Sequence, residues 1–116
     1  MDINMQANNR KSAIAAYKQR PAALGIYAVI CNATGEAWVG ISRHVDTQQN
    51  GLWFALRQGS SSQASLQAAW RRYGEAEFRF EELERLRDDF PEFGRLDELK
   101  RRSALWRARL QAHPLL

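Results

Sequence analysis

The chain has 116 residues, a formal net charge of +4, and apolar and charged fractions of 45% and 26%, values typical of one soluble globular domain. No apolar run approaches the ~20 residues that a membrane span needs, and the N-terminus does not resemble a signal peptide. The single cysteine, Cys31, cannot form an internal disulfide, so we expect a protein of the reducing cytoplasm with no membrane contact.

The first part of the chain predicts a helix followed by a β-hairpin. Residues 1–9 are polar and rich in Gln and Asn, and we expect them to be flexible. A helix is predicted over residues 10–20, ending before Pro21. Two strands are predicted over residues 26–31 and 36–40, separated by an Asn-Ala-Thr-Gly turn.

Two helices are predicted after the hairpin. Asp46 is a candidate N-cap for a helix that reaches about Gln58, although an Asn-Gly pair inside it could delay its start. The next helix is predicted over residues 63–73 and ends before Gly74. Its apolar side chains recur at helical spacing: Leu66, Ala69, Trp70 and Tyr73.

The last part of the chain predicts a strand and a closing helix. Phe78 and Phe80 alternate in the strand, and Pro91 and Gly94 separate it from the helix. One stripe of the helix contains Leu96, Leu99, Ser103, Trp106 and Leu110. The predicted fold is therefore α+β, with a small three-stranded antiparallel sheet flanked by helices in a single domain over residues 10–116, including the extra N-terminal helix.

The hairpin places two aromatic side chains together. A turn at residues 32–35 pairs Tyr27 with Gly40 and Val29 with Trp38. Tyr27 and Trp38 then lie on one face of the sheet as diagonal neighbours. Taken alone, such a pair is more typical of an ordinary core than of an active site.

Several motifs in order resemble one known family. GIY is followed after ten residues by WVG and then by ISRHV. A helix, glycine and strand with alternating phenylalanines follow in residues 66–86, and ALWRARL lies in the closing helix. Over about residues 22–110 this set resembles the GIY-YIG nuclease family, with Trp in place of the second motif tyrosine.

The resemblance implies phosphodiester hydrolysis with one divalent metal, and it assigns a role to four positions. Tyr27 stands at the general-base position, and Trp38 replaces the second tyrosine of the pocket. Gln48 stands at the position of the arginine that neutralises the phosphate, and Ser103 at that of the metal-binding glutamate. Arg43 is the remaining candidate for a substitute cation in this pocket.

Two large electrostatic contributions to catalysis are therefore missing at these positions. We expect a catalytically degenerate domain that holds no metal, with magnesium or manganese required only if the chain is active. A divergent metal-dependent DNA endonuclease that uses Tyr27 and Arg43 is one alternative. A protein-interaction module that uses the acidic residues 75–92, or the apolar run 52–54, is the other.

The charge distribution points to a weak nucleic-acid partner, with DNA expected first. Residues 75–92 contain eight acidic and three basic side chains, whereas residues 95–109 contain six basic and two acidic ones. Basic stripes suit a phosphate backbone. The candidate contacts are Lys100, Arg101, Arg107 and Arg109 on the closing helix, with Lys11 and Lys18 near the N-terminus.

Overall fold

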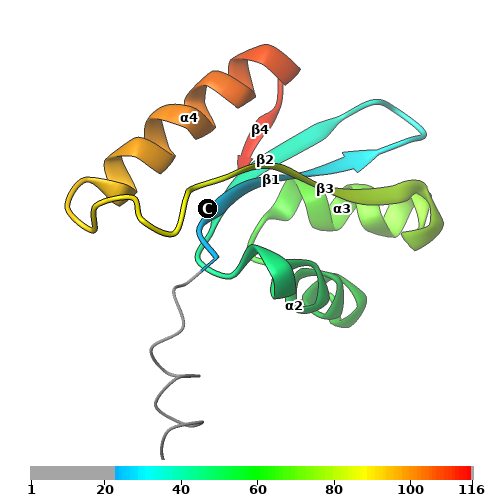
Figure 1. Ribbon diagram of the computed structural model, residues 1–116. Helices are drawn as coiled ribbons and strands as arrows, with labels where there is room; N and C mark the ends of the chain where they lie inside the picture. Colours follow the sequence, from blue (N-terminus) through cyan, green and yellow to red (C-terminus); the bar gives the residue numbers. More distant parts are fainter. Residues whose placement is uncertain (1–22, 116) are drawn as a thin grey trace, which may run out of the picture.

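The computed structural model describes residues 23–115, and within this range a β-sheet is sandwiched between helices (Figure 1). One helix covers one face of the sheet, and two helices cover the other face. The predicted flexible stretch 1–9 and helix 10–20 lie outside the described residues. Over residues 23–115, none of the helices has the length and apolar character that crossing a membrane requires.

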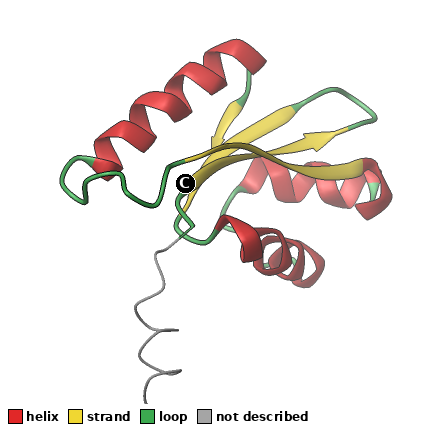
Figure 2. Cartoon of the chain, viewed as in Figure 1, coloured by secondary structure: helices red, strands yellow, loops and turns green. Residues whose placement is uncertain are grey.

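The elements follow the predicted order closely (Figure 2). They are β1 (Gly25–Cys31), β2 (Ala37–Ser42), α2 (Val45–Gln58), α3 (Ala64–Tyr73), the 3-10 helix η1 (Glu75–Glu77), β3 (Phe78–Arg85), α4 (Arg95–Leu110) and β4 (His113–Leu115). The predicted cap at Asp46 is wrong, because α2 begins at Val45 with His44 at the N-cap position and Asp46 in its first turn.

The sheet contains one strand more than predicted. Its order is β3-β1-β2-β4, with β1 antiparallel to both neighbours and β4 parallel to β2. The prediction of three antiparallel strands is therefore correct for β1, β2 and β3 but incomplete. β4 has only three residues and contains Pro114, so the sequence pattern gives no strand signal there.

The predicted hairpin register is confirmed. Tyr27 pairs with Gly40 and Val29 with Trp38, and the Cys31 amide donates to the Glu36 carbonyl at 2.9 Å. Tyr27 and Trp38 both belong to the core between the sheet and helices α2 and α3. The alternation of side chains along the strands thus places both rings on one face.

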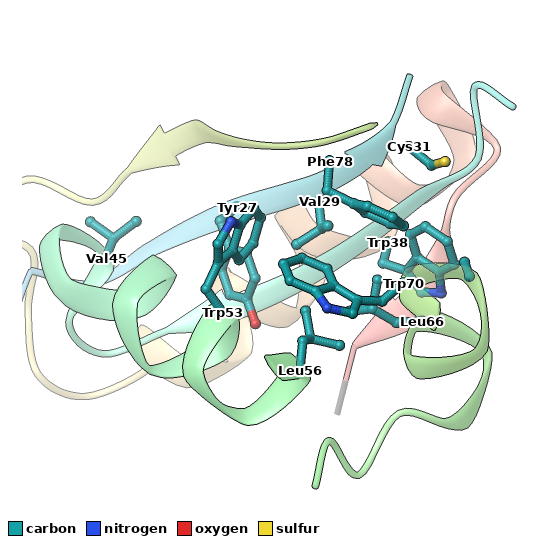
Figure 3. Close-up of a cluster of buried hydrophobic side chains, with 11 residues drawn as sticks. Tyr27, Val29, Cys31, Trp38, Val45, Trp53, Leu56, Leu66, Trp70 and Phe78 are labelled. Carbon is teal, nitrogen blue, oxygen red and sulfur yellow. The ribbon is translucent and has the colours of Figure 1, made fainter. Parts of the chain in front are cut away.

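Two apolar cores lie on the two faces of the sheet. The core under α2 and α3 is rich in aromatic rings (Figure 3), and it contains Tyr27, Val29, Cys31, Trp38, Val45, Trp53, Leu56, Leu66, Ala69, Trp70 and Phe78. The core under α4 is aliphatic at its centre and contains Ile26, Ala28, Val39, Leu86 and Leu99. Adjacent residues of β1 therefore contribute to opposite cores.

The apolar stripe of α4 is buried in its middle but not at its start. Leu99 and Ser103 are buried, and Trp106 is half-buried against the aliphatic core. Leu96 was predicted to share this stripe, yet it is 51% exposed. It lies in the first turn of α4 and borders an open hollow instead of the packed core.

Candidate functional site

A hollow of about 310 Å³ lies on the face of the sheet covered by α2 and α3. It is formed by β1, by α2, by the loop that joins α2 to α3, and by β4. Its lining residues are Tyr27, Gln48, Gly51, Leu52, Ala55, Ser60, Ser61, Ser62, Gln63 and Leu115. The structure thus brings together Tyr27 and Gln48, two of the positions singled out by the family resemblance.

Tyr27 is held rigidly and is 5% exposed. Its ring stacks on Phe80 with centroids 5.1 Å apart and an interplanar angle of 13°. Its hydroxyl lies directly over Gly40, where an added Cβ would come within 2.7 Å of it, so this strand position has no room for a side chain. Burial raises the pKa of the Tyr27 phenol to about 12.

Gln48 is fixed by a short chain of hydrogen bonds at the start of α2. The Ser42 hydroxyl donates to Gln48 Oε1 at 2.8 Å, and the His44 amide donates to the same Ser42 oxygen at 3.0 Å. With its oxygen engaged in this way, the amide nitrogen of Gln48 is the atom that can donate to a ligand. Such a donor could bind a phosphate oxygen without neutralising its charge.

The serine-rich loop is held by a residue that sequence reasoning missed. The buried Gln67 of α3 donates from Nε2 to the Leu56 carbonyl at 3.0 Å, and its Oε1 accepts from the Ser61 amide at 3.2 Å. Gln67 thereby ties the end of α2 to the loop that lines the hollow. Its sequence signal is a polar side chain directly after Leu66 on the buried side of a helix.

Trp38 supports this region from below and does not line the hollow. It is fully buried, and its indole N–H donates to the Ser65 hydroxyl at 2.9 Å. Its ring packs against Phe78 and His113, with centroids 6.4 and 5.5 Å away. Trp38 therefore stands in the core where the resemblance implied a pocket residue.

Ser103 and Arg43 lie on the opposite face of the sheet from Tyr27. Ser103 is 7% exposed on the stripe of α4 that contacts the aliphatic core, and Figure 1 shows α4 across the sheet from α2 and α3. Arg43 lines a second hollow with Leu24 and Ile41, whose side chains pack against that same core. The structure thus does not bring Arg43 or Ser103 to the Tyr27 hollow, and the assignment of Ser103 to the glutamate position of the family stays a prediction.

The basic residues of α4 lie on a helix that Figure 1 shows across the sheet from α2 and α3, and residues of α2 and of the loop between α2 and α3 line the hollow, so within residues 23–115 the basic side chains of α4 do not lie beside Tyr27. Lys100, Arg101 and Arg109 are exposed, and Arg107 is half-buried. The guanidinium of Arg109 lies 5.2 Å from the centre of the Trp106 ring. The other two predicted contacts, at positions 11 and 18, lie outside the described residues.

Part of the positive charge of α4 is used within the fold. Glu98 accepts from Arg101 at 2.5 Å and from Arg102 at 2.6 Å, and these two hydrogen bonds lower the pKa of its carboxyl to about 2. Arg102 also donates to Glu84 at 2.7 Å, and the Trp106 indole donates to the same carboxylate at 2.8 Å. This network fastens α4 to β3, which leaves mainly Lys100, Arg107 and Arg109 for an external partner.

The hollow is therefore neutral in character. The side chains that line it are a phenol, amides, hydroxyls and aliphatic groups. Within residues 23–115, no group of three or more His, Cys, Asp or Glu side chains could hold a metal ion. The arrangement can donate hydrogen bonds to a ligand, but it supplies no fixed charge.

Comparison with known proteins supports the fold alone. No protein-family model matches the chain, and no curated protein matches it. Two solved structures of the catalytic domain of the homing endonuclease I-TevI are similar at 20% identity. The first structure is the E75A mutant, which has a TM-score of 0.65 and covers 77% of this chain and 84% of that domain. The second has a TM-score of 0.66 and covers 80% of this chain and 98% of that domain. The chain thus has a GIY-YIG-like fold, as its motifs indicated.

Proposed function

We propose that the chain is a GIY-YIG-like domain that binds nucleic acid without cleaving it. The observation that carries this proposal is the neutral lining of the hollow around Tyr27 and Gln48. The fold supplies the setting of a nuclease, and the side chains in that setting lack the charges that phosphodiester hydrolysis requires.

Three requirements of hydrolysis are poorly met. A general base must accept a proton, and burial makes the Tyr27 phenolate harder to form by raising the pKa of the phenol to about 12. A fixed cation must balance the extra charge on the phosphate, and Gln48 has none. A hard metal needs a carboxylate, and the family position for it is Ser103, across the sheet. Because loss of one such electrostatic group commonly costs ~10²–10³ in rate, their combined loss argues against turnover.

Binding is supported instead by the part of α4 that follows Glu98. No acidic residue follows Glu98 in the sequence, whereas Lys100, Arg107 and Arg109 do. Contacts of this kind go to phosphates and read little sequence. We expect a dissociation constant of ~10⁻⁴–10⁻⁶ M at physiological salt, and three phosphate contacts predict a slope of about −3 in a plot of log affinity against log salt concentration.

Fluorescence anisotropy with a labelled DNA duplex, over a series of salt concentrations, tests the binding. Reversing Lys100→Glu and Arg109→Glu should abolish binding, whereas the matched double reversal Arg71→Glu and Arg72→Glu on α3 should weaken it much less. Loss of affinity that is equal in both variants would assign binding to net charge alone. Undetectable binding of the wild type at low salt, to duplex, single-stranded or branched DNA, would overturn the proposal.

Metal binding and cleavage test the catalytic half of the proposal separately. Calorimetry should show no stoichiometric site for magnesium or manganese. Plasmid and branched DNA should remain intact with either metal. Cleavage that disappears in the Tyr27→Phe variant, but persists in Tyr73→Phe, would establish an active nuclease instead.

A protein-interaction module is the second candidate, and two surfaces favour it. Phe93 is 97% exposed in the loop before α4, and the half-exposed Leu96 lies nearby at the second hollow, also of about 310 Å³. The run 52–54 was the other candidate surface, and Phe54 is indeed 62% exposed there. Phe54 lines a hollow of about 440 Å³ and Leu96 lines the second hollow, so each surface offers an exposed apolar side chain beside a depression.

A further inference from the structure

The C-terminal strand closes one side of the Tyr27 hollow. β4 pairs in parallel with β2, in the register Trp38 with His113, Val39 with Pro114 and Gly40 with Leu115. The Leu115 side chain lines the hollow and packs against the aromatic core. Both Leu115 and the Tyr27 hydroxyl approach Gly40, at 3.0 and 2.7 Å from the point where its Cβ would stand. β4 thus helps to shield the Tyr27 hydroxyl from solvent.

The attachment of β4 is slight compared with that of the other strands. It consists of three residues, and Pro114 has no amide to donate to the sheet. It follows α4 directly, through Gln111 in the left-handed conformation with φ 52°. β1, in contrast, pairs along its length with strands on both sides. Segments with so few backbone bonds open locally at a small fraction of the cost of global unfolding.

His113 provides the main anchor outside the backbone. Its Nε2 lies 2.7 Å from Glu36 Oε2, and its ring lies 5.5 Å from that of Trp38. Both side chains of this contact are well exposed, at 47% and 37%. Because solvent competes for both side chains, this contact contributes little to the stability of the pairing between β4 and β2.

We propose that β4 is a detachable strap, and that its release from β2 exposes the buried Tyr27 hydroxyl at the floor of the hollow. The strap is independent of whether the chain binds nucleic acid through α4. It controls whether a ligand in the hollow can accept a hydrogen bond from the Tyr27 phenol in addition to those from Gln48 and the serine hydroxyls.

Chemical nitration of tyrosine tests this access in the full chain, with mass spectrometry assigning each site. Tetranitromethane attacks exposed, ionisable phenols, so Tyr27 of the wild type should react slowly. Leu115→Asp places a charge at the apolar contact of the strap and should increase nitration of Tyr27 at least tenfold. Leu105→Asp makes the same change at an exposed position of α4 and should have no effect. Ultraviolet titration should show the pKa of Tyr27 falling from about 12 toward 10 only in the first variant.

Hydrogen exchange of the wild type gives a second test that requires no variant. The amides of His113 and Leu115 should exchange at least 100-fold faster than those of β1. Exchange of β4 as slow as that of β1 would overturn the proposal. It would also be overturned if Leu115→Asp releases β4, as judged by exchange, while Tyr27 remains resistant to nitration. If Leu115→Asp unfolds the chain, the milder His113→Ala variant takes its place in the nitration experiment. The exchange of the wild type then provides the second measurement of whether β4 detaches.

Discussion

The two faces of the sheet are stabilised by different physical means. Under α2 and α3 the rings of Tyr27, Trp38, Trp53 and Trp70 lie in one aromatic core. Under α4 the core is aliphatic, and its rim is fastened by charged hydrogen bonds centred on Glu84. The polar groups that line the hollow on the first face are neutral, whereas the second face carries the charged side chains of α4.

This division bears directly on function. A nuclease site needs a phenol, a cation and a metal-binding carboxylate around one phosphate. Here the phenol lies on one side of the sheet, and Arg43 and Ser103 lie on the other. Rotation of a side chain cannot move a group through a packed sheet, so Arg43 and Ser103 cannot complete a site around Tyr27 in this structure.

The first prediction contrasts the packing of the two faces. Trp38→Ala should lower the free energy of unfolding by about 3–5 kcal/mol, because it empties a fully buried site. Trp106→Ala on the half-buried face of α4 should cost less than half as much. Urea denaturation measures both losses, and equal losses would contradict the contrast between the faces.

The second prediction tests whether Ser103 can be restored as a metal ligand. Ser103→Glu should destabilise the fold by at least about 2 kcal/mol, since it places a carboxylate in an apolar contact of α4. The exposed neighbour Ala104→Glu should be nearly neutral. Combining Ser103→Glu with Gln48→Arg should give no cleavage of DNA. Recovery of metal-dependent cleavage would show that the two positions meet in one site.

Sequence reasoning predicted local geometry well and the placement of α4 poorly. The hairpin register followed from a four-residue turn and the two-residue period of strands, which together leave little choice. The stripe of α4 correctly predicted that Leu99 and Ser103 are buried. However, the apolar stripe of a helix does not predict which face of the sheet the helix packs on, because both faces of β1 are apolar. The expected neighbours of Ser103 were wrong for that reason.

Two other features had weak signals for physical reasons. β4 is short and contains a proline, so its pairing depends on contacts made after α4 has docked. Gln67 acts through hydrogen bonds to residues 56 and 61, whose positions only the folded chain defines. The meeting of Tyr27 with Gln48 was predicted through the resemblance to a known fold, and local spacing would not have provided it.

The third prediction concerns how the stability of each face depends on pH. The lowered pKa of Glu98 contributes stability that is complete above about pH 4.5 and is lost as the pH falls toward 2. The raised pKa of Tyr27 has the opposite consequence: the unfolded phenol ionises first, so stability falls as the pH rises from about 10 to 12, by up to about 1.4 kcal/mol per unit. The urea midpoint of each variant should be measured as a function of pH. The decrease at acid pH should disappear in Glu98→Gln, and the decrease at alkaline pH should disappear in Tyr27→Phe.

The fourth prediction concerns the charged rim of α4. Glu84→Gln should cost about 1 kcal/mol, because Arg102 and Trp106 then donate to a neutral acceptor at a half-buried position. Glu81→Gln on the same strand removes an exposed pair with Arg79 and should cost under about 0.5 kcal/mol. Thermal unfolding of the two variants in parallel provides the measurement, and similar shifts would assign Glu84 no special role.

The smallest effect is expected for Gln48→Ala, and it connects the hollow to the binding proposal. The change leaves the buried Ser42 hydroxyl without its acceptor, which should cost about 0.5–1 kcal/mol of stability. Affinity for duplex DNA should stay within twofold of the wild type, because the hollow lies across the sheet from Lys100 and Arg109. Fluorescence anisotropy should compare the affinity of Gln48→Ala for duplex DNA with that of the double reversal Lys100→Glu and Arg109→Glu. If Gln48→Ala weakens binding as much as that reversal does, nucleic acid contacts the hollow, and the two faces do not act independently.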